Sequence, residues 1–146
     1  MHLLLRLHIR LVTLAIPLLD RWLPLPRLVR LLIAGPKWQP YRRVPVATIS
    51  VLVHAALRRP RWMKRRACYR LGLTMGHFLR LAGQPVLMHF AVAPPSMDPR
   101  RLHAHCWVTV NGEDITAPSL PGTHMRTFVQ FSVDNETEFR TMFVKN

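Results

Sequence analysis

Apolar positions near the start of the chain recur at spacings of three and four residues, as they do on one face of an α-helix. In the segment 3–16 these positions are Leu3, Leu4, Leu7, Leu11, Leu14 and Ala15. Arg6, Arg10 and Thr13 fall on the other side of the same predicted helix. We expect Pro17 to end or kink this helix, because proline lacks the amide hydrogen that a helix interior requires.

The pattern predicts three further helices in the first part of the chain. Their ranges are 26–34, 46–57 and 65–81. The first of them is closed by Gly35-Pro36, and the third is followed by Gly83 and Pro85. The proline-rich stretch 36–45 is typical of a connector.

Beyond these helices the pattern changes to short apolar runs bounded by proline and glycine, which predict β-strands. The runs cover residues 86–92, 105–110, 113–117 and 128–133. Asn111-Gly112 lies between the second and third runs and strongly favours a two-residue hairpin turn. Prolines indicate loops at 94–99 and 118–122, and the tail 134–146 receives no element.

This order of elements predicts the α+β class, with one helix laid across an antiparallel sheet. We interpret residues 1–63 as a basic, Leu/Arg-rich helical N-terminal region and residues 64–146 as the core that carries the chemistry. The length of 146 residues suits one domain with a helical extension.

The charge is concentrated in the N-terminal half. The formal net charge is +14, and residues 1–67 hold 14 of the 21 basic residues but only one acid, Asp20. A basic segment of this kind favours anionic partners. The arginines alternate with leucines in a helical pattern and no nucleic-acid motif is present, so nucleic acid is disfavoured. A membrane-surface contact through residues 1–34, a partner-docking helix, or a helical subdomain with a solvated basic face are the readings that stay open.

The longest uncharged apolar run of the N-terminal segment, Leu11–Leu19, is too short to cross a bilayer. No small-residue cleavage site follows it, as an export signal would require. The two cysteines, Cys68 and Cys106, do not make a disulfide framework. We therefore expect reduced thiols and a cytoplasmic protein, peripheral at the inner membrane if the basic helices bind it.

Cys68 falls at the start of the predicted helix 65–81. The unpaired amides and positive dipole at a helix N-terminus stabilise a thiolate, which is the nucleophilic form of cysteine. Lys64, Arg65 and Arg66 add positive charge next to it. A lone helical cysteine is more often a small core residue, so a base is needed to support a catalytic role.

His105 begins a predicted strand and is the candidate for that base. A cysteine at a helix start and a histidine on a strand form the arrangement of papain-like and transglutaminase-like enzymes. In that chemistry the imidazole accepts the thiol proton and later protonates the leaving amine. His103 lies two residues earlier and is a second candidate for the base. Trp107, two residues after His105, favours His105.

The residues around this pair resemble the lasso-peptide leader peptidases, microcin-processing cysteine proteases with a transglutaminase-like fold. The segment Cys68–Leu73 is similar to the opening of that family's core helix. The segment Leu81–Pro85 and the apolar run after it are similar to its helix exit and first strand. His105-Cys106-Trp107-Val108 resembles its His-Ala-Trp-Val motif, and Asn111-Gly112 falls where the family has an Asp-Gly hairpin. The resemblance covers residues 65–117.

Two positions depart from the family pattern. Cys106 stands where alanine is usual, and its alternation with His105 points it to the opposite face of the strand, as a core residue.

The family's third catalytic residue, an aspartate, would fall near Thr116 or Ala117, where this chain has no acid. Asp114 is the nearest carboxylate and is assigned as the group that orients His105. A two-residue turn places Asp114 on the His105 face but nearer Thr109, whereas a bulged turn places it on the other face. Thr116 or a backbone carbonyl could hold the ring instead.

The resemblance implies a cysteine protease that cleaves the leader from a ribosomally made lasso-type precursor peptide. Cys68 would attack, His105 would act as general base, and no cofactor would be needed. The implied partners are the precursor leader, a small leader-recognition protein, and a cyclase and transporter of the same pathway. Two alternatives stay open. One is a transglutaminase-like acyltransferase, and the other is a catalytically dead protein that binds membranes or nucleic acid.

The remaining histidines and thiols receive structural interpretations. His54, His77 and His89 lie in apolar surroundings and are expected to be hydrogen-bonded interior residues, while His124 lies in a predicted loop. A zinc site is disfavoured because no ligand pair has a familiar spacing. Its candidate ligands would be Cys68, His103, His105, Cys106 and His124.

Overall fold

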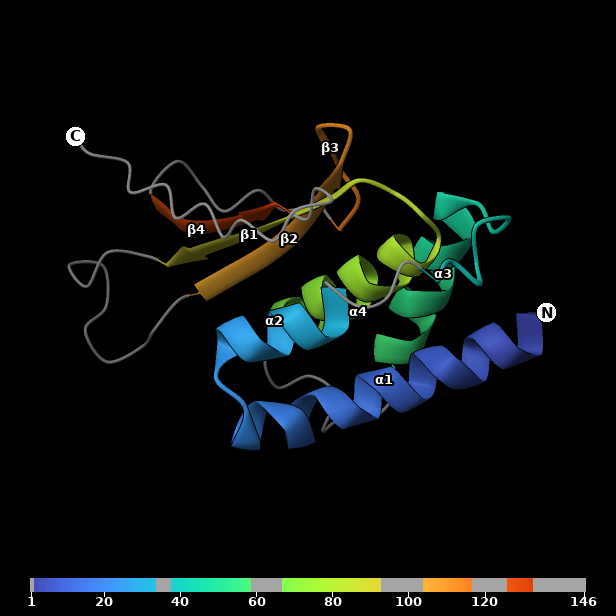
Figure 1. Ribbon diagram of the computed structural model, residues 1–146, viewed down its shortest axis with the longest axis horizontal. Helices are drawn as coiled ribbons and strands as arrows, with labels where there is room; N and C mark the ends of the chain where they lie inside the picture. Colours follow the sequence, from blue (N-terminus) through green and yellow to red (C-terminus); the bar gives the residue numbers. More distant parts are fainter. Residues whose placement is uncertain (1, 34–37, 59–66, 93–103, 117–125, 133–146) are drawn as a thin grey trace.

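The computed structural model describes residues 2–33, 38–58, 67–92, 104–116 and 126–132 (Figure 1). The predicted loops at 94–99 and 118–122, the tail 134–146 and the basic cluster at 64–66 lie outside this described part. So do His103, His124 and the side chain of His105.

Within the described residues four helices precede four strands, which agrees with the predicted α+β class (Figure 1). The helices are α1 (His2–Trp22), α2 (Leu25–Ile33), α3 (Val46–Leu57) and α4 (Ala67–Leu81). The strands are β1 (Val86–Val92), β2 (Ala104–Val110), β3 (Glu113–Asp114) and β4 (Arg126–Ser132). The predicted return strand 113–117 is shorter than expected, because regular pairing stops at Asp114.

Helix α1 continues through Pro17 to Trp22, so of the two outcomes expected at this proline, an end or a kink, the end is excluded. Its leucine stripe, which the periodicity selected as the apolar face, is exposed to solvent. The side that packs against the protein carries Leu5, Ile9, Thr13 and Ile16, each at most 1% exposed. Thr13 is tolerated there because its hydroxyl donates a hydrogen bond to the carbonyl of Ile9, 2.6 Å away.

Helix α4 is the centre of the fold and contacts the other three helices as well as β1 and β2. Its C-terminus is closed by Gly83, whose φ of 76° is the left-handed conformation that glycine adopts without strain. The amides of Gly83 and Gln84 donate to the carbonyls of Arg80 and Leu79, at 2.9 and 3.0 Å. This is a Schellman cap, and it turns the chain into β1.

The sheet is antiparallel with the strand order β3-β2-β1-β4. Alternate residues of β1 and β2 are buried on the side that faces α4, and the pairs there are Val86↔Val110, Met88↔Val108 and Phe90↔Cys106. In Figure 1 the sheet lies on one side of α4 and α1 on the other. The order of layers is therefore sheet, α4 and α1.

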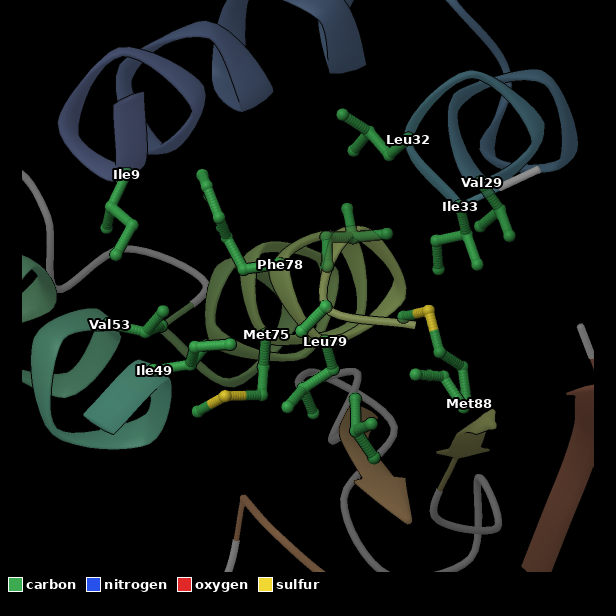
Figure 2. Close-up of a cluster of buried hydrophobic side chains, with 14 of the residues drawn as sticks. Ile9, Val29, Leu32, Ile33, Ile49, Val53, Met75, Phe78, Leu79 and Met88 are labelled. Atoms are coloured by element: carbon green, nitrogen blue, oxygen red, sulfur yellow. The ribbon is translucent and has the colours of Figure 1, made fainter. Parts of the chain in front are cut away.

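One buried cluster joins all four helices to the sheet (Figure 2). Phe78 of α4 is fully buried at its centre. Around α4, Figure 2 shows Ile9 from α1, Leu32 and Ile33 from α2, Ile49 and Val53 from α3, and Met88 from β1. Residues on both sides of position 63 share this core, while the division into two regions stays a prediction.

Candidate active site

Cys68 lies in the first turn of α4, as the sequence predicts. Its side chain is half-buried, and neither cysteine is in a disulfide. Cys68 therefore lies at the helix end where the first backbone amides have no partner within the helix. The helix dipole favours negative charge at this end.

The two residues that follow Cys68 tie this turn to α1. The hydroxyl of Tyr69 donates a hydrogen bond to Oδ1 of Asp20, 3.0 Å away. Nη2 of Arg70, a side chain that is only 4% exposed, donates to the carbonyl of Thr13 at 3.4 Å. The N-terminal helix therefore holds in place the turn that carries the candidate nucleophile.

Cys106 of β2 packs directly against the same end of α4. It is 3% exposed, and a Cβ atom added at Gly72 would collide with its Sγ. Burial raises the pKa of the Cys106 thiol, and negative charge at Cys68 raises it further. Cys106 is thus a core residue, as expected.

The backbone of His105 immediately precedes Cys106 in β2 and pairs with Ala91 of β1. The strand segment that carries the candidate base therefore passes the N-terminal end of α4. The orientation of the imidazole lies outside the described part, so the pairing of Cys68 with His105 stays a prediction.

Asp114 lies at the other end of β2. Asn111 and Gly112, with φ of 53° and 85°, form a two-residue turn, and Asp114 pairs with Thr109. Thr109 is four residues from His105, which is about 13 Å along a strand. The structure therefore places Asp114 near Thr109, as the two-residue register predicts, and does not bring its backbone beside His105.

The carboxylate of Asp114 is engaged with Thr116. Its Oδ1 accepts hydrogen bonds from the amide and the hydroxyl of Thr116, at 2.8 and 3.0 Å. The hydroxyl of Thr116, a 7% exposed residue, also accepts from the amide of Val108 in β2, at 2.9 Å. Asp114 thus fixes Thr116, and Thr116 fixes β2 three residues beyond His105.

The sheet face opposite α4 carries His89, Trp107 and Thr109, which the sequence analysis did not predict to lie together. Nε2 of His89 lies 3.0 Å from the hydroxyl of Thr109, and its ring stacks on Trp107 with centroids 4.8 Å apart. Burial lowers the pKa of His89, whereas the charge of Asp114 raises it. Period-two alternation on two paired strands could have placed these residues together.

His77 is an interior histidine, as expected. Its Nδ1 is hydrogen bonded to the carbonyl of Leu32, and its ring meets the edge of Phe78 at a centroid distance of 5.0 Å. In the part of the chain that the structure describes, no group of three His, Cys, Asp or Glu side chains is placed to hold a metal ion.

A central helix that begins at a cysteine, packed on an antiparallel sheet with a histidine on the adjoining strand, is the architecture of cysteine-dependent acyl-transfer folds. Residues 10–129 match the family model described as the transglutaminase-like superfamily, and the chain belongs to this superfamily. The match begins inside α1 and ends inside β4. No curated protein and no solved structure matched the chain. Membership is consistent with Cys–His enzymatic activity and leaves the substrate open.

Proposed function

We propose that the protein is a cysteine protease that removes the leader from a ribosomally synthesised, lasso-type precursor peptide. The observation that carries this proposal is the position of Cys68, a half-buried thiol in the first turn of the central helix, next to the strand of His105. The similarity of the residues around both positions to the leader peptidases supports the substrate class.

In the proposed reaction His105 accepts the thiol proton of Cys68, and the thiolate attacks the carbonyl carbon of the scissile amide. The backbone amide of Cys68 stabilises the oxyanion. Collapse of the tetrahedral intermediate breaks the C–N bond, and the imidazolium protonates the departing amine. Water, deprotonated by His105, then hydrolyses the thioester and regenerates the thiol.

Asp114 enters this proposal as a positioning residue rather than as a group in contact with the base. It holds Thr116, and Thr116 anchors β2 at Val108. Through this chain of hydrogen bonds Asp114 would keep the strand of His105 in register. The proposed partners are the precursor leader, a leader-recognition protein, and a cyclase and transporter, in the cytoplasm or at the inner membrane surface.

The first experiment compares the alkylation of the two thiols. Cys106→Ala leaves Cys68 as the only thiol, and Cys68→Ala leaves Cys106. Iodoacetamide labelling of the folded protein followed by mass spectrometry should modify Cys68 rapidly, because a neighbouring base accepts the thiol proton and makes the nucleophilic thiolate available. Cys106 should react only after denaturation, because it is buried.

His105→Ala should abolish this rapid labelling of Cys68, and His89→Gln is the matched control on the neighbouring strand. Slow labelling of Cys68 in the folded protein would remove the nucleophile assignment. Incubation with precursor peptide then separates the two reaction types by product mass. Hydrolysis gives a free leader with one added water, whereas an acyltransferase gives a cross-link to an amine.

A further inference from the structure

Helix α1 exposes an apolar stripe along most of its length. The stripe consists of Leu4, Leu7, Leu11, Leu14, Leu18 and Trp22, and the exposed fractions range from 39% at Leu14 to 81% at Trp22. At 3.6 residues per turn these six side chains fall within an arc of about 80°. We call this set the exposed leucine stripe.

The exposed leucine stripe is separate from the face of α1 that builds the core. Leu5, Ile9 and Ile16 lie on nearly the opposite side of the helix and are buried against α3 and α4. The stripe therefore adds nothing to the fold of the chain, although exposing several leucines on one helix face is unfavourable in water. An exposed apolar face of this kind marks a surface that contacts a partner or a membrane.

The charged residues of α1 indicate which kind of surface the exposed leucine stripe contacts. Arg6, Arg10 and Arg21 are exposed and lie along one edge of the stripe. The single acid of α1, Asp20, is half-buried and accepts a hydrogen bond from Tyr69. Two copies of α1 packed stripe to stripe in antiparallel orientation would bring these arginines onto the same edge, which disfavours that dimer. An anionic surface with an apolar interior matches both the arginines and the leucines.

The geometry suits a flat surface. α1 forms the layer of the molecule farthest from the sheet, so nothing in the described fold projects beyond it on that side (Figure 1). Trp22 lies at the C-terminal end of the stripe, and tryptophan favours the boundary between lipid headgroups and hydrocarbon. No described helix is long and apolar enough to span a membrane.

We propose that α1 docks the protein on anionic phospholipid, with the exposed leucine stripe in the acyl boundary and its arginines among the headgroups. This placement concerns a different face of the protein from Cys68 and holds whether or not Cys68 is a nucleophile. It predicts reversible binding that weakens with salt, because screening reduces the contribution of the arginines.

The test uses the full chain and sedimentation with vesicles of phosphatidylcholine alone or mixed equally with phosphatidylglycerol. The wild type should bind the mixed vesicles. The triple variant Leu4→Gln/Leu11→Gln/Leu18→Gln should bind them about tenfold more weakly or worse, since it removes three apolar contacts. Arg6→Gln/Arg10→Gln should lose about 25-fold, since each arginine near an anionic surface contributes about fivefold. The matched control is Val51→Gln, an equally exposed apolar residue on α3, and it should bind like the wild type.

Circular dichroism and thermal unfolding show whether each variant keeps the fold, which is expected because every substituted side chain is exposed. Equal binding by the wild type and the folded leucine variant would overturn the proposal. So would a dimer that the leucine variant abolishes, or binding to an acidic peptide without binding to vesicles. Cys68→Ala should bind vesicles normally, which separates this inference from the proposed protease activity.

Discussion

Arg70 on α4 hydrogen bonds to the carbonyl of Thr13 on α1, with Nη2 and the oxygen 3.4 Å apart. Thr13 is the residue whose carbonyl would accept the amide of residue 17 in a regular helix, and Pro17 has no amide hydrogen. The guanidinium therefore supplies the donor that proline removes. This explains how α1 continues through Pro17 and why a buried arginine stands two residues after Cys68.

Substitutions at these two positions should be coupled. Pro17→Ala restores an amide donor at an exposed site, so it should raise the free energy of unfolding by about 1–3 kcal/mol. Arg70→Met should lower it by about 1.5–3 kcal/mol in the wild type. In the Pro17→Ala background the loss should be about 1 kcal/mol smaller, because the Thr13 carbonyl keeps a partner. Urea unfolding of the four proteins measures the coupling.

Leu18→Ala, next to Pro17 but exposed, is the control and should show no coupling to Arg70→Met. Additive free energies for the Pro17 and Arg70 substitutions would mean that Arg70 does not compensate for the proline.

The sequence located the helices where local residues end them, although Pro17 does not end α1. Gly83 shows this well, since its positive φ closes α4 at the predicted place. The sequence did not show which side of α1 is buried. α1 is apolar on two opposite faces, and a period of 3.6 residues identifies a helix without stating which face meets the core. Thr13 was assigned to the polar side, yet its hydroxyl is satisfied inside the helix itself.

The candidate site was predictable where it depends on local position. Cys68 at the start of α4 and Cys106 in the core both follow from element boundaries and strand alternation. The hydrogen bonds that hold the turn of Cys68 against α1 were not predictable, because they join residues far apart in the chain. Tyr69 meets Asp20 across 49 positions, and Arg70 meets Thr13 across 57. Such contacts depend on how helices pack, which periodicity does not encode.

The charge of Asp114 should have a measurable effect on the pKa of His89. Burial lowers the pKa of His89, and Asp114 raises it. Removing the charge in Asp114→Asn should therefore lower the pKa of His89 further, which NMR titration of the imidazole would detect. Glu113→Gln is the matched control, because it removes a neighbouring exposed carboxylate that pairs with Val110 instead. An unchanged or raised pKa in Asp114→Asn would contradict the placement of this carboxylate.

Protein stability should fall as the solution becomes acidic. Burial lowers the pKa of each of four histidines, namely His8, His54, His77 and His89. Below about pH 6.5 the unfolded chain takes up protons on these rings while the folded protein resists, so acid favours unfolding. Thermal melts from about pH 7.5 downward should show falling midpoints once the pH passes about 6.5. His77→Asn keeps a donor for Leu32 but cannot titrate, so its midpoint should depend less on pH. An equal dependence in this variant would exclude His77 as a source of the effect.

The contact between α4 and β2 predicts that the effect of Gly72→Ala on the free energy of unfolding depends on Cys106. In the wild type, Gly72→Ala should lower the free energy of unfolding by about 1–3 kcal/mol, because the added Cβ collides with the Sγ of Cys106. In a Cys106→Ala background that sulfur is absent, and alanine is the better helix former by about 1 kcal/mol. There the same substitution should be neutral or stabilising. Gly76→Ala is the control, because its Cβ would meet Met88 and Ile33 at 3.1 and 3.2 Å and should not respond to Cys106. Urea unfolding of the double-mutant cycle measures this, and an equal loss in both backgrounds would show that Cys106 does not set the distance between α4 and β2.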